Sequence, residues 1–201
     1  MTFAITKSSL KVIGSLLVVT VVSSCVNAGP TKNEVFSDNI PVIIPPFQKN
    51  KTFLIGQSFH GRVSHQGALN AYAVDLAMPK GEAVCAVKAG TVSALKDVDQ
   101  AMKADKRFRE DNFVLIKHND KTWSVYGHLA PGSISVKKRQ KIKEGECFAN
   151  VGNTGYSTAP HLHMALLKLQ REEKRFVSMP FRFLQRNGKA TVPRYLRWVR
   201  N

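Results

Sequence analysis

The residues best suited to chemistry are two histidines at the end of a loop in the C-terminal half of the sequence. The stretch Gly152 to His163, GNTGYSTAPHLH, is rich in turn residues and closes on His161 and His163. Side chains at i and i+2 of a strand share a face, so both imidazoles point the same way while Leu162 faces the opposite layer. Two imidazoles on one face can share a metal site, or divide into one ligand and one catalytic group.

Three earlier segments add the polar groups that a hydrolytic metal centre uses. They are Ser64 to Gly67 with His65, Tyr72 to Pro79 with Asp75, and Tyr126 to Leu129 with His128. A hydrolytic zinc site needs three protein ligands and keeps a fourth position for a water, whose pKa the metal lowers to about 7. His65, Asp75 and His163 can fill that role.

The neighbours of Asp75 bear on this interpretation. Val74 and Leu76 are apolar, and an unpaired carboxylate buried between them would be unfavourable unless a metal compensated its charge. A solvated aspartate at the end of a strand is the alternative.

Taken in order, these motifs resemble the lysostaphin-type metalloendopeptidases, a family of zinc enzymes that cleave peptidoglycan peptides. The resemblance covers Phe53 to Phe183. It implies one zinc ion per chain, held by His65, Asp75 and His163. It also implies that His128 and His161 stay unliganded, activate the attacking water and stabilise the oxyanion.

The sequence departs from the family pattern in two places, the spacing after His65 and the segment that contains His128. Nine residues separate His65 from Asp75, where many members have three, so a longer turn must return the chain. His60 competes with His65 as the ligand, but His65 better matches the family's His-x-Gly pattern. Gly127 stands where alanine is common, and we expect no harm from it because both residues are small.

The elements that must position these groups are short apolar stretches rich in Val, Ile, Phe and Thr, separated by turn residues. This pattern predicts an all-β domain. The clearest strands are Ala83 to Val87, Thr91 to Leu95, Phe113 to His118, Thr122 to His128 and His161 to Lys168. With the resemblance, they predict a two-layer antiparallel β-sheet or sandwich, the duplicated hybrid motif of lysostaphin-type peptidases. Its groove would have the histidine-bearing sheet as floor.

Two segments are candidate walls of that groove. One is the turn from Gln66 to Ala71, and the other is the insertion from Asp97 to Asp111. Within the insertion, Asp99 to Arg109 has mixed charges and few apolar residues, which favours an exposed helix.

The N-terminus predicts export. Lys7 and Lys11 precede an apolar run of eleven residues, Val12 to Val22, which is shorter than the roughly 20 residues of a membrane-spanning helix. We therefore predict a signal peptide over residues 1–24, a tether over 25–51 and a metalloendopeptidase domain over 52–201.

The signal peptide ends in Val22-Ser23-Ser24-Cys25, which resembles a lipoprotein cleavage site with Cys25 as the lipidated residue. The expected location is the cell envelope or periplasm, with the lipid in a membrane. Ordinary cleavage after Ala28, giving a soluble secreted protein, remains the alternative.

Charge and cysteines set further expectations. The chain has 30 Lys and Arg against 14 Asp and Glu, for a net charge of +16. The sequence lacks a basic stripe interleaved with stacking aromatic residues, the pattern that would indicate nucleic-acid binding. Peptidoglycan peptides and anionic envelope polymers are therefore the expected partners. Alternatively, the charge serves solubility alone. Cys85 and Cys147 either pair in the oxidising compartment or remain two buried thiols.

The predicted function is thus a zinc-dependent hydrolase of peptidoglycan cross-links or stem peptides. Two alternatives are a catalytically silent regulator of other wall hydrolases, as some family members are, and a wall-binding lipoprotein.

Overall fold

The computed structural model describes residues 36–37, 39–98 and 111–201. The predicted signal peptide, Cys25 and the helix expected over residues 99–109 lie outside this part of the chain. The described residues form strands and turns, and among them no helix is long and apolar enough to cross a membrane.

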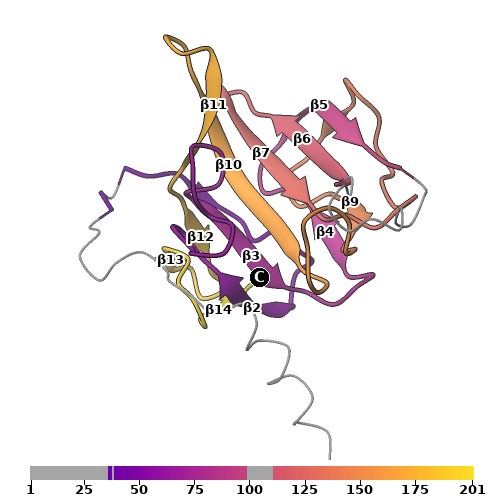
Figure 1. Cartoon of the computed structure of the whole chain (residues 1–201). Helices are drawn as coiled ribbons and strands as arrows, with labels where there is room; N and C mark the ends of the chain where they lie inside the picture. The colour runs from indigo at the N-terminus through magenta and orange to yellow at the C-terminus, as the bar shows by residue number, and fades with distance from the viewer. Residues whose placement is uncertain (1–35, 38, 99–110) are drawn as a thin grey trace, which may run out of the picture.

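One large antiparallel sheet carries most of the fold (Figure 1). Its order is β14-β2-β3-β10-β7-β6-β5-β8, and β11 pairs with the far end of β10. Its strands are β2 (Thr52–Gln57), β3 (Ala73–Ala77), β5 (Gly90–Lys96), β6 (Phe113–Lys117), β7 (Thr122–Gly127), β8 (Lys141–Ile142), β10 (Leu162–Gln170), β11 (Arg175–Met179) and β14 (Trp198–Arg200).

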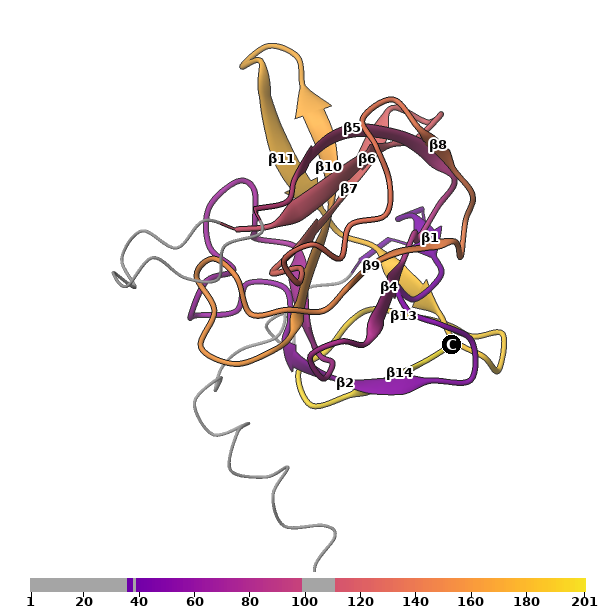
Figure 2. The same ribbon diagram turned by 90° about the vertical axis from the view of Figure 1, so that its right-hand side faces the viewer.

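Two small sheets complete the second layer. In one, β4 (Ala83–Cys85) pairs with β9 (Cys147–Asn150); in the other, β12 (Arg182–Leu184) lies between β1 (Val42–Ile43) and β13 (Ala190–Thr191). Figure 2 shows β4 and β9 beside the curved large sheet. The buried core joins the two layers, for example Tyr126 of the large sheet with Phe148 of β9, whose rings are 5.0 Å apart. The predicted all-β, two-layer class is confirmed.

The alternation along β10 decides which face carries chemistry. Leu162 and Met164 are fully buried in the core between the layers, while Ala165 belongs to a small cluster on the opposite face. His163 lies between Leu162 and Met164 in the sequence, so its side chain points to the opposite face, the one that carries Ala165.

The strand predictions in the middle of the chain are confirmed with small shifts at their ends. Strands β6 and β7 form an antiparallel hairpin through residues 118–121. His118, at the end of β6, has a structural role. Its side chain is buried, Nδ1 donates to the carbonyl of Ala89 at 2.9 Å, and Nε2 lies 3.0 Å from Ser124 Oγ.

Part of the predicted tether packs against the sheets. Val42 and Ile43 form a parallel pairing with Arg182 and Phe183, and Phe47 is 1% exposed. These three residues of the predicted tether therefore contribute to the packing of the described sheets. Burial of this short apolar patch against β12 is energetically more favourable than its exposure to water in a solvated linker would be.

Cys85 and Cys147 form a disulfide that joins β4 to β9. We expect its removal to destabilise the protein, because it closes a loop between cysteines 62 residues apart, worth about 4 kcal/mol in the chain-entropy model. The measurement is urea unfolding of the wild type, with and without reductant, and of the double variant Cys85→Ala/Cys147→Ala. Reductant should lower the wild-type midpoint and leave the double variant unchanged. Equal midpoints for all samples would contradict the prediction.

Candidate functional site

The site starts from the pairing of β3 with β10. Asp75 and His163 lie directly opposite each other in this pair, and His163 Nδ1 is 2.9 Å from Asp75 Oδ1. Val74 and Leu76 turn into the core and are fully buried, so Asp75 projects from the other face together with His163. Strand register alone therefore brings together two groups 88 residues apart.

His65 comes from the loop between β2 and β3 and reaches the same carboxylate. Its side chain is fully buried, with Nε2 3.1 Å from Asp75 Oδ1. Its Nδ1 lies 2.7 Å from the carbonyl of Ser58. A carbonyl can only accept, so Nδ1 carries a proton, and Nε2 is the ring nitrogen turned toward Asp75.

The long turn between His65 and Asp75 places the two competing histidines differently. The main chain closes through hydrogen bonds from His60 N to Ala71 O and from Ala71 N to Gly67 O. The ring of His60 packs against Tyr72, with centroids 4.7 Å apart. His65, and not His60, lies beside Asp75.

These three groups suit a zinc ion. Their ligand atoms, two imidazole nitrogens and one carboxylate oxygen, all lie within 4.8 Å of one another. Nitrogen and oxygen donors of this kind are the usual set for catalytic zinc, and a hydrogen bond from the other ring nitrogen commonly orients a ligating histidine. His65 has such a bond to Ser58.

The electrostatics of Asp75 fit the same role. Burial by itself would raise the pKa of this carboxyl, but hydrogen bonds from His163 and His65 outweigh it, and the pKa lies well below its usual value. Asp75 is therefore a carboxylate at neutral pH, the form that binds a cation.

A glutamine that the sequence motifs did not single out supports this carboxylate. Gln57 is 3% exposed, and its Nε2 donates to Asp75 Oδ2 at 2.7 Å and to Ser64 Oγ at 2.8 Å. Its Oε1 accepts from the main-chain N–H groups of Val63 and Ser64. Gln57 thus ties the His65 loop to Asp75. No sequence signal marked it, because a glutamine in a strand is ordinary.

His128 and His161 stand next to the three grouped residues. Their rings are 4.6 Å apart, and the His128 ring is 5.7 Å from that of His163. Each Nδ1 lies 2.8 Å from a main-chain carbonyl, that of Thr154 for His128 and that of Ala159 for His161. Nδ1 is the protonated nitrogen in both rings, so Nε2 is left to accept or deliver a proton.

The surroundings move the pKa values of these two histidines in opposite directions. Burial would lower the pKa of His128, but Asp111 foremost, with Asp75 and the Thr154 carbonyl, raises it. For His161, burial prevails over the attraction of Asp75, and the pKa falls. The two imidazoles are chemically distinct although they touch.

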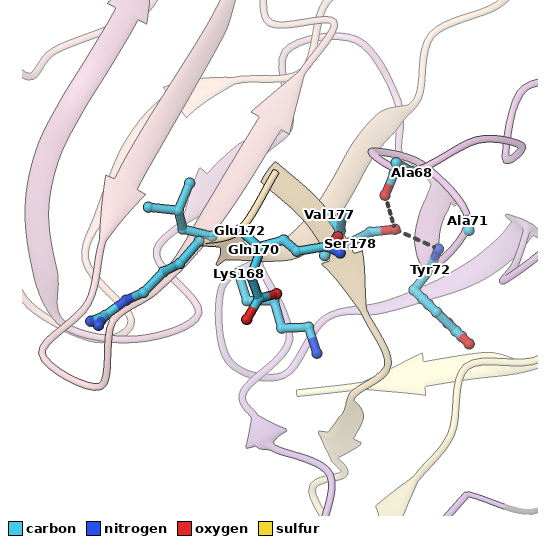
Figure 3. Close-up of a pocket in the computed structure, with 10 residues that line it drawn as sticks. Ala68, Ala71, Tyr72, Lys168, Gln170, Glu172, Val177 and Ser178 are labelled. Carbon is cyan, nitrogen blue, oxygen red and sulfur yellow. Dashed lines mark hydrogen bonds between the residues drawn. The ribbon is translucent and has the colours of Figure 1, made fainter. Parts of the chain in front are cut away.

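An open pocket lies farther along β10 from His163, between the turn that the sequence suggested as a groove wall and the β10–β11 hairpin (Figure 3). Ser178 anchors the turn there: its Oγ donates to the carbonyl of Ala68 and accepts from the N–H of Tyr72, both at 3.0 Å. The five predicted site residues are not part of its lining. Of the other predicted wall, only residues 97, 98 and 111 lie within the described chain.

Comparison with known proteins identifies the family. The model for peptidase family M23 matches residues 70–175, just over half of the chain. The matched region contains Asp75, His128, His161 and His163, whereas His65 lies shortly before it.

Two curated relatives differ in the roles that their names state. The chain is 36% identical over 93 residues to the peptidoglycan DD-endopeptidase ShyA of Vibrio cholerae, covering 46% of this chain and 19% of that protein. It is 32% identical over 94 residues to the murein hydrolase activator NlpD of Salmonella dublin, covering 46% and 22%. The chain thus spans about a fifth of the length of these relatives.

Among solved structures, the chain is similar to the catalytic domain of the prophage-encoded M23 protein EnpA from Enterococcus faecalis. The identity is 26%, the TM-score is 0.46, and the match covers 62% of this chain and 87% of that one. The family match over residues 70–175 agrees with the motifs and the all-β fold, and the chain belongs to peptidase family M23, as its resemblance to the lysostaphin-type enzymes implied.

Proposed function

We propose that this protein is a zinc-dependent endopeptidase that hydrolyses peptide cross-links or stem peptides of bacterial peptidoglycan. One observation carries the proposal: the chain holds all five polar groups of the centre together, with three histidines around Asp75 Oδ1 and the His128 ring beside those of His161 and His163. His163 Nδ1, His65 Nε2 and His161 Nε2 lie 2.9, 3.1 and 3.7 Å from that oxygen. A protein selected only for wall binding has no need to keep five such groups together.

His65, Asp75 and His163 would hold the metal. A zinc ion bound there supplies a Lewis acid for the peptide carbonyl and makes an attacking water more acidic. Gln57 keeps the second oxygen of Asp75 occupied, so that Oδ1 is directed at the two histidines.

His128 and His161 would move the protons. Hydrolysis of a peptide bond needs a group that takes a proton from the attacking water and returns it to the leaving amine, and a donor for the carbonyl oxygen as it becomes negative. The two Nε2 atoms suit these tasks because both rings are fixed through Nδ1.

The same proposal includes location and partners. Export through the N-terminal signal, with Cys25 lipidated and the domain held near the wall, agrees with similarity to proteins named as lipoproteins, such as the outer membrane antigenic lipoprotein B of Histophilus somni. The net charge of +16 suits attraction to anionic envelope polymers.

The test is release of soluble fragments from purified peptidoglycan, with the new amine ends identified by mass. We expect zinc-loaded protein to release fragments, chelation to abolish the release, and added zinc to restore it. His60→Ala, a histidine change outside the centre, should leave the release intact. The masses would also name the scissile bond.

The similarity to NlpD supports one alternative, a regulator that activates other wall hydrolases. The two functions separate in the same assay. If the protein binds zinc yet releases nothing alone, and increases fragment release by a purified murein hydrolase, the regulator is the correct function and the endopeptidase proposal fails.

A further inference from the structure

The main chain at His128 has an uncommon conformation. Its φ is +61°, in the left-handed region that costs a residue with a Cβ about 1 kcal/mol or more. The N–H of His128 donates to Asp111 Oδ1 at 2.7 Å. A charge-assisted hydrogen bond of this length offsets the cost of the left-handed backbone conformation. It also fixes the backbone from which the His128 side chain projects.

The same carboxylate also meets the ring of His128. Asp111 Oδ1 is 3.3 Å from His128 Nδ1. Thr154, whose carbonyl accepts from that Nδ1, has its hydroxyl 3.4 Å from the same oxygen. One aspartate therefore contacts the main chain and ring of His128, and the loop that fixes the ring.

Two glycines leave room for this aspartate. A Cβ at Gly155 would lie 2.7 to 3.0 Å from side-chain atoms of Asp111, and a Cβ at Gly127 would lie 3.0 Å from Asp111 Oδ2. Gly127 is the position where alanine is common in the family. The structure gives this departure a reason: glycine there accommodates the carboxylate.

We propose that Asp111 is a positioning residue of the catalytic centre, which holds His128 in its left-handed backbone conformation and orients its ring, with Gly127 as the matched partner that makes space for it. The proposal rests on the proposed peptidase function of His128. Asp111 acts through His128 and has no contact with the three predicted zinc ligands among the interactions of the described residues.

Steady-state kinetics of Asp111→Ala and Asp111→Asn test the role. Mutation of a supporting residue of this kind typically lowers activity about 10- to 100-fold. We expect Asp111→Ala to lower kcat by that amount with KM within about twofold and zinc content unchanged. Asp111→Asn keeps an acceptor oxygen and should recover most of the loss.

Asp120→Ala is the matched control. It removes a carboxylate of similar side-chain exposure, 46% against 39% for Asp111, from the turn between β6 and β7. Its kcat should equal that of the wild type. An unchanged kcat in Asp111→Ala, or a loss that tracks zinc content in all variants, overturns the proposal.

The pairing with Gly127 has its own test. Gly127→Ala should lower kcat in the wild type, because its Cβ crowds Asp111, and should have little further effect once Asp111 is alanine. Equal effects of Gly127→Ala in both backgrounds would show that the glycine does not serve the aspartate.

A readout independent of hydrolysis separates this inference from the function on which it rests. Hydrogen exchange of the His128 amide and the ¹⁵N shift of its ring Nδ1 report the contacts directly. Both should change in Asp111→Ala and remain close to wild type in Asp111→Asn, even if no wall fragment is ever released. Failure of the peptidase function would leave these signals intact, whereas an unaltered amide in Asp111→Ala would refute the positioning role.

Discussion

His163→Ala is expected to abolish zinc binding and wall hydrolysis together. His163 Nδ1 is one of only three grouped ligand atoms in the described chain and lies 2.9 Å from Asp75 Oδ1. Its loss leaves two ligands, too few for a catalytic zinc site. The metal contributes several kcal/mol of transition-state stabilisation, so hydrolysis should fall at least about a thousandfold at about 1.4 kcal/mol per tenfold.

The measurement pairs metal analysis with the wall assay. Zinc content per chain after dialysis is compared for wild type, His163→Ala and His60→Ala, together with the rate of fragment release. The His60 variant controls for loss of an imidazole on the neighbouring loop, where its ring packs on Tyr72. Full zinc occupancy in His163→Ala would show that the metal lies elsewhere.

His128→Ala and His161→Ala are expected to separate catalysis from metal binding. Each should reduce kcat by about 10²- to 10⁴-fold, the range for loss of a positioned proton-transfer group or oxyanion donor. Zinc content should stay at the wild-type level, because neither ring belongs to the group of three ligand atoms. Circular dichroism and unfolding midpoints establish that the variants are folded.

The double variant sharpens this prediction. The two rings are 4.6 Å apart and are proposed to act in the same reaction. Residues that act as a unit give non-additive losses of activity when both are removed. His128→Ala/His161→Ala should therefore lose much less than the product of the single effects. A variant that loses zinc as well as activity would reassign its histidine from proton transfer to metal binding.

Much of the fold could be predicted from local pattern. Strand pairs linked by short turns, such as β6 and β7, are set by alternating apolar residues and turn chemistry within about fifteen residues. Val42 and Ile43, inside the predicted tether, pair with β12, about 140 residues later in the chain. No local pattern contains that partner.

The candidate site, too, could be predicted from the sequence only in part. The period of a strand was enough to place His161 and His163 on one face and Leu162 in the core. Gln57 and Asp111 were missed as supporting residues, since each acts through a contact with a residue distant in sequence: 18 positions for Gln57 and Asp75, 17 for Asp111 and His128.

The sequence by itself determined the residue types of the centre, their order and the motifs that resemble the family. Only the tertiary structure decided that β3 lies beside β10, that His65 and not His60 faces Asp75, and that Cys85 meets Cys147. The physical reason is common to all three. Side-chain direction follows from the local geometry of a strand, whereas the neighbour that a side chain meets depends on which distant segments pack together to bury the core.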